Sequence, residues 1–131
     1  MELLELISKS ETKQFKVVFP NTLNAHDTLF GGDAMKWMDE VAYIAATRFT
    51  RQKMVTVYTG KINFIKPIPF GTIAVIIGKI LKVGSVKLDI HVEIYVEEMF
   101  TETKFKAVEA IFTFAAVDSN HKPLKICIYD I

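Results

Sequence analysis

Apolar residues recur at intervals of three and four along residues 32–49 of this chain. They are Met35, Met38, Ala42, Ala45, Ala46 and Phe49. Side chains at this spacing share one face of a helix, so the pattern predicts a helix over 32–49 with a buried apolar stripe. No second long helix is predicted.

The second half of the chain has the two-residue period of β-strands instead. Between Ser85 and Glu98, every second position from Val86 to Val96 is apolar and the positions between them are mostly charged. This alternation predicts a long antiparallel strand with one face toward solvent. Four more strands are predicted, over residues 13–19, 55–65, 72–83 and 103–117.

The predicted order is a strand, a helix and then four long strands in a meander. A helix with one apolar stripe and a sheet with one apolar face bury these surfaces against each other. We therefore expect an α+β domain in which a curved antiparallel sheet wraps around a central helix. A chain of 131 residues suits a single domain, here 1–131 with a core at about 13–123. The long exposed sheet edge predicts pairing with a second chain.

Charge and composition exclude several classes of protein. The 16 basic and 15 acidic residues are spread along the chain, so we expect no nucleic-acid partner. Charged residues interrupt every candidate membrane helix, and the first residues lack the pattern of a secretory signal. The single cysteine, Cys127, excludes an intrachain disulfide, which agrees with a cytoplasmic location. His26, His91 and His121 are scattered without metal-ligand spacing, so no metal site is predicted.

Gly31 and Gly32 stand where the predicted helix begins. Glycine at this position permits either a tight turn or the approach of a ligand to backbone amides that have no partner within the helix. Such amides, together with the helix dipole, stabilise the oxyanion that forms when a carbonyl group is attacked. The residues alone leave both interpretations open.

Asp39 borders the apolar stripe of the same helix. Carboxylates are seldom buried without a purpose, so Asp39 is a candidate for catalysis or for a structural hydrogen bond, whereas Glu40 is expected in solvent. At about 1.5 Å per residue, Gly31 and Asp39 lie roughly 12 Å apart along the helix. If both act on one carbonyl group, they must come from two chains whose helices run antiparallel.

A series of short blocks surrounds these candidates. It consists of Asn24–Gly32, Met35, Met38–Asp39, Ala42, Val55–Val57, Phe64–Pro67, Gly71, Gly84–Ser85 and Ala110–Asp118. In this order and spacing, the blocks resemble the acyl-CoA thioesterases of the hotdog superfamily, the group of the bacterial YciA-like enzymes and the brain-type acyl-CoA hydrolase. The resemblance covers roughly residues 15–123.

The resemblance implies the hotdog fold and the hydrolysis of acyl-CoA to a free fatty acid and coenzyme A. It implies that Asp39 is the catalytic carboxylate, that Asn24 is its polar partner, and that the substrate binds between subunits. The amide of Gly31 or Gly32 then holds the carbonyl oxygen. Asp39 acts either as a general base on water or as a nucleophile, and the residues do not separate these roles.

Coenzyme A contacts are expected at Gly84 and Ser85, which resemble a coenzyme A loop of the family. Lys66, Lys82 and Lys104 are candidates for its phosphates, although most surface lysines only face solvent. Coenzyme A is part of the substrate and the product, so no separate cofactor is expected. The family often forms trimers of dimers, which is the assembly expected here.

The alternative function is an acyl-CoA-binding or regulatory hotdog protein that does not cleave the thioester; Asp39 and Asn24 favour the enzyme. A hotdog dehydratase is less favoured, because its usual histidine and acidic pair has no counterpart at the helix start. Two departures leave the substrate range open. Many members have glycine or asparagine in place of Asp27, and an apolar residue in place of Asp33. Asp33 either stabilises the helix start or repels an anionic ligand.

Overall fold

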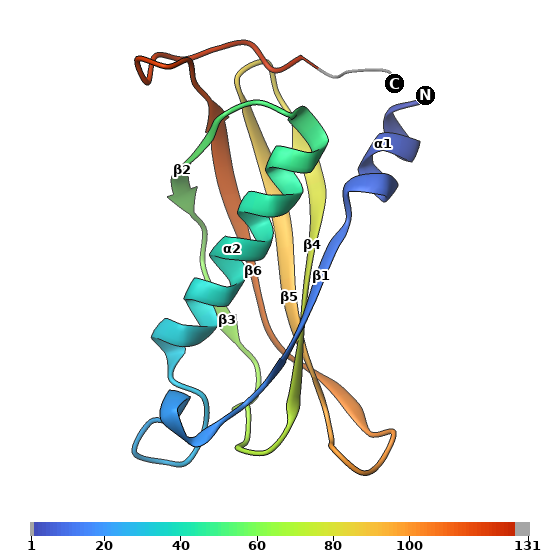
Figure 1. The fold of residues 1–131 in the computed structure, drawn as a ribbon, viewed down its shortest axis with the longest axis vertical. Helices are drawn as coiled ribbons and strands as arrows, with labels where there is room; N and C mark the ends of the chain where they lie inside the picture. Colours follow the sequence, from blue (N-terminus) through green and yellow to red (C-terminus); the bar gives the residue numbers. More distant parts are fainter. Residues whose placement is uncertain (1, 128–131) are drawn as a thin grey trace.

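The computed structural model describes residues 2–127, so the ends of the predicted domain, residues 1 and 128–131, lie outside the described residues. A long helix, α2 (Gly31–Thr50), lies across the concave face of a six-stranded antiparallel sheet (Figure 1). The strands are β1 (Thr12–Val17), β2 (Met54–Thr59), β3 (Asn63–Phe64), β4 (Ile73–Val83), β5 (Lys87–Glu97) and β6 (Lys104–Ala116). The predicted α+β architecture, a curved sheet around a central helix, is confirmed.

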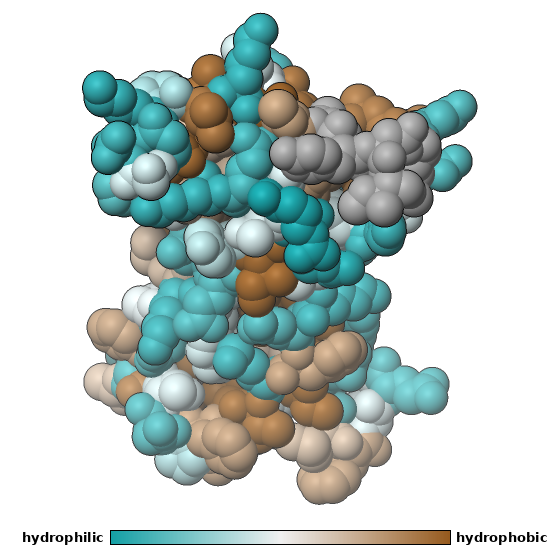
Figure 2. Space-filling view, turned by 45° about the horizontal axis from the view of Figure 1, so that its top comes forward, coloured by the Kyte–Doolittle hydropathy of each residue, from teal (hydrophilic) through white to brown (hydrophobic). Residues whose placement is uncertain are grey.

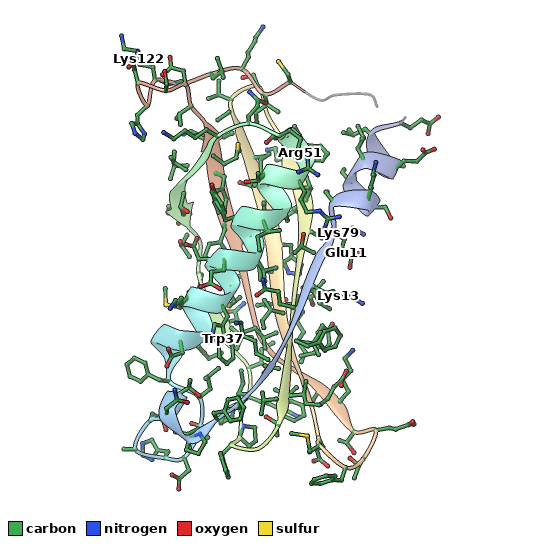
Figure 3. The ribbon with its side chains drawn as sticks, viewed as in Figure 1. Glu11, Lys13, Trp37, Arg51, Lys79 and Lys122 are labelled. Carbon is green, nitrogen blue, oxygen red and sulfur yellow. The ribbon has the colours of Figure 1, made fainter. Side chains whose placement is uncertain are left out.

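Helix α2 forms where the apolar period predicts it. Its end is marked by Arg51, which adopts the left-handed conformation at φ 55° (Figure 3). The buried apolar residues of α2 are Ala34, Trp37, Met38, Val41, Ala42, Ala45, Ala46 and Phe49. Met35 was expected on this stripe but is 40% exposed. A helix has 3.6 residues per turn, and the stripe that begins at Ala34 and Trp37 leaves Met35 on its flank.

The strand order differs from the predicted meander. Strands β4, β5 and β6 are consecutive neighbours, but β1 pairs with the free edge of β4 and β2 pairs with β6. The connection over residues 65–72 therefore crosses the end of the sheet. Within it, Ile68 is buried and its carbonyl accepts a hydrogen bond from the Leu29 amide at 2.8 Å. Because β2 and β3 pair with β6 and not with β4, the connection is not a hairpin, and the meander prediction is wrong for residues 55–65.

Residues 55–65 also form two strands instead of the predicted one. The pairing with β6 is interrupted at Gly60, whose amide donates to the Ile111 carbonyl at 2.8 Å. A Cβ atom at Gly60 would lie only 3.2 Å from the same oxygen. Glycine permits this close approach, after which β3 resumes the pairing with β6.

The hydrophobic core lies between α2 and the inner face of the sheet. In β5 the inward side chains from Leu88 to Val96 are at most 1% exposed, which confirms the predicted alternation. At Gly78 of β4 the helix packs closely against the backbone of the sheet. A Cβ atom there would lie 2.9 Å from Val41 Cγ1 and 3.4 Å from the Val41 carbonyl oxygen. The absence of a side chain at Gly78 therefore sets how closely α2 packs on the sheet.

A short helix, α1 (Leu3–Ser10), precedes β1 and was not predicted. It lies near the C-terminal end of α2 (Figure 1), and Leu6 and Ile7 pack on the core. The Arg48 guanidinium of α2 donates to the carbonyl oxygens of Lys9 at 2.9 Å and Glu11 at 3.1 Å. Neither of the two described α-helices has the length and hydropathy that crossing a membrane requires.

Candidate active site

The loop that leads into α2 is organised by the side chain of Asn24. Its Oδ1 atom accepts hydrogen bonds from the amides of His26 at 2.8 Å and Thr28 at 3.3 Å. Its Nδ2 atom donates to the Thr28 hydroxyl at 2.9 Å. Asn24 is partly buried, so these bonds fix the loop that places the following glycines.

Asp27 occupies the tightest point of this loop. Its φ angle is 59°, in the left-handed region that glycine adopts freely and that asparagine and aspartate tolerate better than other residues. Aspartate is therefore compatible with the backbone conformation of this turn. The departure at Asp27 preserves the turn while adding an exposed negative charge.

The start of α2 presents two free backbone amides. Phe30 is the N-cap and makes no side-chain capping bond, while its carbonyl accepts hydrogen bonds from the amides of Asp33 and Ala34. Among residues 2–127, the amides of Gly31 and Gly32 have no acceptor. They are available to bind a carbonyl oxygen or an oxyanion.

Asp39 faces strand β2. Its Oδ1 atom accepts a hydrogen bond from the Thr56 hydroxyl at 3.2 Å, and no other side chain of the described part of the chain bonds to it. Asp39 and Glu40 are both partly buried. Glu40, which was expected in solvent, is thus only partly exposed.

Thr56 is a residue that the sequence reasoning did not select. It lies in the Val55–Val57 block, where a hydroxyl-bearing residue between two valines could have been noted as a candidate polar group. Only the packing of β2 beside α2 makes it a partner of Asp39. A hydrogen bond from Thr56 leaves the other carboxylate oxygen of Asp39 accessible to water or substrate.

Two pockets lie beside the first half of α2. The first, here called the Gly31 pocket, has a volume of about 370 Å³ and is lined by Asn24, Thr28, Leu29, Gly31, Ala34, Phe64, Lys66, Pro67, Ile68 and Val108. The second, the Asp39 pocket, has a volume of about 310 Å³ and is lined by Gly32, Met35, Lys36, Asp39, Thr56, Thr59 and Phe112. They share no lining residue, so one chain holds the predicted catalytic residues in two separate places.

The Gly31 pocket lies at the apolar end of the molecule. This end is formed by the loops over residues 18–30, 65–72 and 98–103, and Figure 2 shows apolar side chains gathered there. The exposed aromatic residues of these loops are Phe19, Phe30, Phe70 and Phe100. Exposed apolar surface of this kind is typical of a ligand-binding or subunit-binding region.

The predicted coenzyme A residues lie at both ends of the molecule. Lys66 lines the Gly31 pocket, and Lys104 begins β6 at the same end. Lys82 near the end of β4, and Gly84 and Ser85 in the β4–β5 turn, lie at the opposite end, near the C-terminal end of α2 (Figure 1). Within one chain, the structure brings Lys66 to Asn24 and Gly31 but does not bring the β4–β5 turn to them.

A separate charged group lies on the outer face of the sheet. The ammonium group of Lys106 contacts Glu109 and lies 2.8 Å from Glu93. The hydrogen bonds with Glu109 and Glu93 raise the pKa of Lys106. The bond between Lys106 and Glu109 also lowers the pKa of Glu109. The negative charge of Glu93 raises the pKa of Tyr95.

His91 joins this group although no metal site was predicted from the sequence. Ligand atoms of His91, Glu93 and Glu109 lie within 4.8 Å of one another. The fold, not the sequence spacing, brings them together. Lys106 already contacts both carboxylates and offsets one of their two negative charges, so the arrangement is that of an ion-pair network on the sheet surface.

Comparison with known proteins finds relatives that share the part of the chain containing Asp39 and Thr56. The sequence pattern of the thioesterase superfamily matches residues 26–101. The acyl-CoA thioester hydrolase YkhA of Bacillus subtilis, itself uncharacterized, is 34% identical over 128 residues, which are 96% of this chain and 74% of that protein. The acyl-CoA thioester hydrolase YciA of Salmonella typhimurium is 30% identical over 82% of this chain and 83% of its own.

Solved structures agree in fold. An acyl-CoA hydrolase from Staphylococcus aureus, in complex with butyryl coenzyme A, coenzyme A and coenzyme A disulfide, is similar with a TM-score of 0.88 at 30% identity, over 93% of this chain and 74% of that one. A hexameric broad specificity acyl-coenzyme A thioesterase has a TM-score of 0.78 at 33% identity, over 87% of this chain and 79% of that one. The expected hotdog fold and family are confirmed: the chain belongs to the thioesterase superfamily, among its acyl-CoA thioester hydrolases.

Proposed function

We propose that this acyl-CoA thioester hydrolase cleaves its substrate at a site shared by two chains. The free Gly31 amide of one chain holds the carbonyl oxygen, and Asp39 of the other chain acts on the carbonyl carbon. Gly31 suits this role better than Gly32, which lies in the wall of its own chain's Asp39 pocket. The observation that carries the proposal is the separation of the Gly31 pocket from the Asp39 pocket within one chain.

The edge of β2 is the best-placed surface for the pairing of two chains. The two edge strands of the sheet are β1 and β2, and Thr56 of β2 is bonded to Asp39. On the same strand, Val57 and Tyr58 are 46% and 65% exposed. Antiparallel pairing of two β2 strands would bring the Asp39 side of one chain to its partner, whereas pairing through β1 would not. The proposed full assembly is a trimer of such dimers, supported by the hexameric relative.

The chemistry follows from the groups in these pockets. When Asp39 acts as a general base, it takes a proton from water as the water oxygen bonds to the acyl carbon. When it acts as a nucleophile, its own oxygen forms an anhydride that water then hydrolyses. In both cases the carbon–sulfur bond breaks, the Gly31 amide stabilises the oxyanion, and the coenzyme A thiolate finally receives a proton. Asn24 orients the water or the carbonyl group from the chain that supplies Gly31.

Variants of the Staphylococcus aureus hydrolase support this choice of residues. Its structure has been solved with an aspartate, an asparagine or a threonine replaced by alanine. Those three residues are spaced along that chain as Asn24, Asp39 and Thr56 are along this one. We therefore add Thr56 to the proposed site as the residue that orients the Asp39 carboxylate.

The proposed coenzyme A contacts divide between chains. Lys66 and Lys104 lie at the end of the molecule that holds Asn24, so either reaches a phosphate near the mouth of the Gly31 pocket. Lys82, Gly84 and Ser85 lie at the other end. These three contact the same coenzyme A only from a different chain of the assembly.

Complementation between inactive chains tests the shared site. An Asp39→Asn chain and an Asn24→Ala chain are each expected to lose at least about a hundredfold of thiol release from acyl-CoA. After subunit exchange, about half of the dimers are hybrids, and in each hybrid one of the two sites has both residues intact. Activity should therefore return to about a quarter of that of the parent protein.

Thr56 provides a matched control for this experiment, because its hydrogen bond places it in the same half-site as Asp39. Mixing Thr56→Val with Asn24→Ala should restore activity, whereas mixing Thr56→Val with Asp39→Asn should not exceed the mean of the two parents. Exchange is verified by mass spectrometry of the intact dimers. If hybrids form but neither mixture that contains Asn24→Ala exceeds the mean activity of its two parent variants, the two-chain site is wrong.

A further inference from the structure

We propose that the Phe30 ring of each chain covers the Asp39 carboxylate of its partner and closes the partner's Asp39 pocket over the thioester. This inference rests on the proposed shared site. It adds to that site a residue that lines neither the Gly31 pocket nor the Asp39 pocket of its own chain.

Phe30 is an exposed aromatic residue at the start of α2. It is the N-cap residue of the helix, and it is 54% exposed. It directly precedes Gly31, whose free amide is proposed to hold the carbonyl oxygen of the substrate. An exposed aromatic ring beside a proposed subunit contact is typical of surface that a partner chain buries.

The ring of Phe30 lies over Gly32. A Cβ atom at Gly32 would lie only 2.8 and 3.1 Å from two carbons of the ring, so the ring can lie there only because position 32 has no side chain. Gly32 lines the Asp39 pocket and precedes Asp39 by seven residues, which is about two helical turns. Residues two turns apart share one face of a helix. The ring therefore lies on the face of α2 that carries Asp39.

The shared site determines what this ring meets in the partner chain. Antiparallel helices that place Gly31 opposite the partner's Asp39 place Phe30 opposite the residue after it. They place Gly32 opposite the residue before it. The ring, which lies on Gly32, is therefore level with the partner's Asp39. The start of α2 and strand β2 lie along the same side of the molecule (Figure 1), so the ring is also on the side where the two chains are proposed to pair.

An apolar ring at this point changes the surroundings of the reacting carbonyl group. It lies beside the Gly31 amide of its own chain and the partner's Asp39, and it keeps bulk water away from both. A hydrogen bond from an amide to an oxyanion is stronger where water is excluded. Loss of the ring should therefore weaken catalysis, although Phe30 takes no part in proton transfer or bond formation.

The substitution Phe30→Ala tests this role. The kcat/KM for acyl-CoA, measured by thiol release, should fall at least about tenfold, while native mass spectrometry should still show the dimer. Phe30→Leu keeps an apolar side chain and should retain most of the activity. Phe100→Ala is the control, because it removes a ring that is 95% exposed on the β5–β6 turn at the same end of the molecule, and it should leave kcat/KM unchanged. A parent-like kcat/KM in Phe30→Ala would overturn the inference.

Subunit exchange shows which chain the ring serves. Mixing Phe30→Ala with Asp39→Asn should restore about a quarter of the parent activity, because one site of each hybrid combines an intact Asp39 with an intact Phe30 from the other chain. Mixing Phe30→Ala with Asn24→Ala should not exceed the mean of the two variants, because both residues belong to the same half-site. If Asp39→Asn is complemented by Asn24→Ala but not by Phe30→Ala, the shared site stands and this inference is wrong. If hybrids form and neither pair complements, both are wrong.

Gly32→Ala moves the ring without removing it, because the added methyl group and the ring cannot occupy the same space. Alone it should lower kcat/KM, and in the mixtures it should behave as Phe30→Ala does, which keeps the test valid if Phe30→Ala does not assemble. Combined with Phe30→Ala, its loss should be far from additive, since the ring that it displaces is already absent. Strictly additive losses would show that the ring does not act from its position on Gly32 and would overturn the inference.

Discussion

The close packing of α2 on Gly78 of β4 leads to a quantitative prediction for Gly78→Ala. The added Cβ would lie 2.9 Å from Val41 Cγ1 and 3.4 Å from the Val41 carbonyl oxygen, where carbon atoms normally stay about 3.5–4.0 Å apart. Replacing glycine by alanine within a strand usually contributes about 0.5–1 kcal/mol of stability. Overpacking of a core costs about 1–3 kcal/mol, and the carbonyl contact cannot relax without moving α2. The cost of the clash should exceed the gain from removing glycine, so the free energy of unfolding should fall by about 1–2 kcal/mol.

Thermal unfolding at one fixed protein concentration measures this loss. Unfolding entropy of about 2.1 cal/mol/K per residue converts 1 kcal/mol to about 4 °C for a chain of this length, so Tm should fall by about 4–8 °C. Val41→Ala should relieve part of the clash, giving the pair a favourable coupling of about 1 kcal/mol in a double-mutant cycle. Lys79→Ala, at the next and exposed position of β4, is the control and should change Tm little.

The same change should lower activity, because Val41 and Asp39 lie on the same stretch of α2. A helix raised from the sheet changes the position of Asp39 relative to Thr56 of β2, and small displacements of a catalytic group are costly. Gly78→Ala with the Tm and kcat/KM of the parent would refute the close-packing argument. Strictly additive effects of Gly78→Ala and Val41→Ala would show that their contact is not the cause.

Two further predictions concern named hydrogen bonds. Thr56→Val keeps the shape of the side chain but removes the bond to Asp39, so kcat/KM should fall about tenfold with little change in KM; a parent-like kcat would contradict the assigned orienting role. Glu109→Gln should destabilise the protein at neutral pH, because pairing with Lys106 lowers the pKa of Glu109 below its ordinary value of 4.5. A lowered pKa contributes stability that is present above the ordinary pKa and is lost as pH falls through the folded-state pKa. Urea unfolding from pH 7 to pH 3 should therefore show the parent and the variant converging below about pH 4; a difference independent of pH would exclude this linkage.

Local sequence patterns were sufficient for the elements that depend on one apolar face. The period of three and four residues located α2, and strict alternation located β5, because burial against a single surface imposes these periods directly. Helix α1 was missed because much of its position depends on Arg48, which lies far from it in the sequence. The break at Gly60 was missed for the same reason, since its cause is a carbonyl group of β6.

The sequence by itself also selected the candidate positions Asn24, Gly31, Gly32 and Asp39. The rise of about 1.5 Å per helical residue predicted that Gly31 and Asp39 come from two chains if both act on one carbonyl group. The tertiary structure decided their surroundings. The pairing of β2 with β6 could not be predicted from the order of the strands along the chain. This pairing brings Thr56 within hydrogen-bond distance of Asp39. The division into two pockets arises because the curved sheet covers both flanks of α2, and such a surface depends on contacts between distant segments that no local pattern encodes.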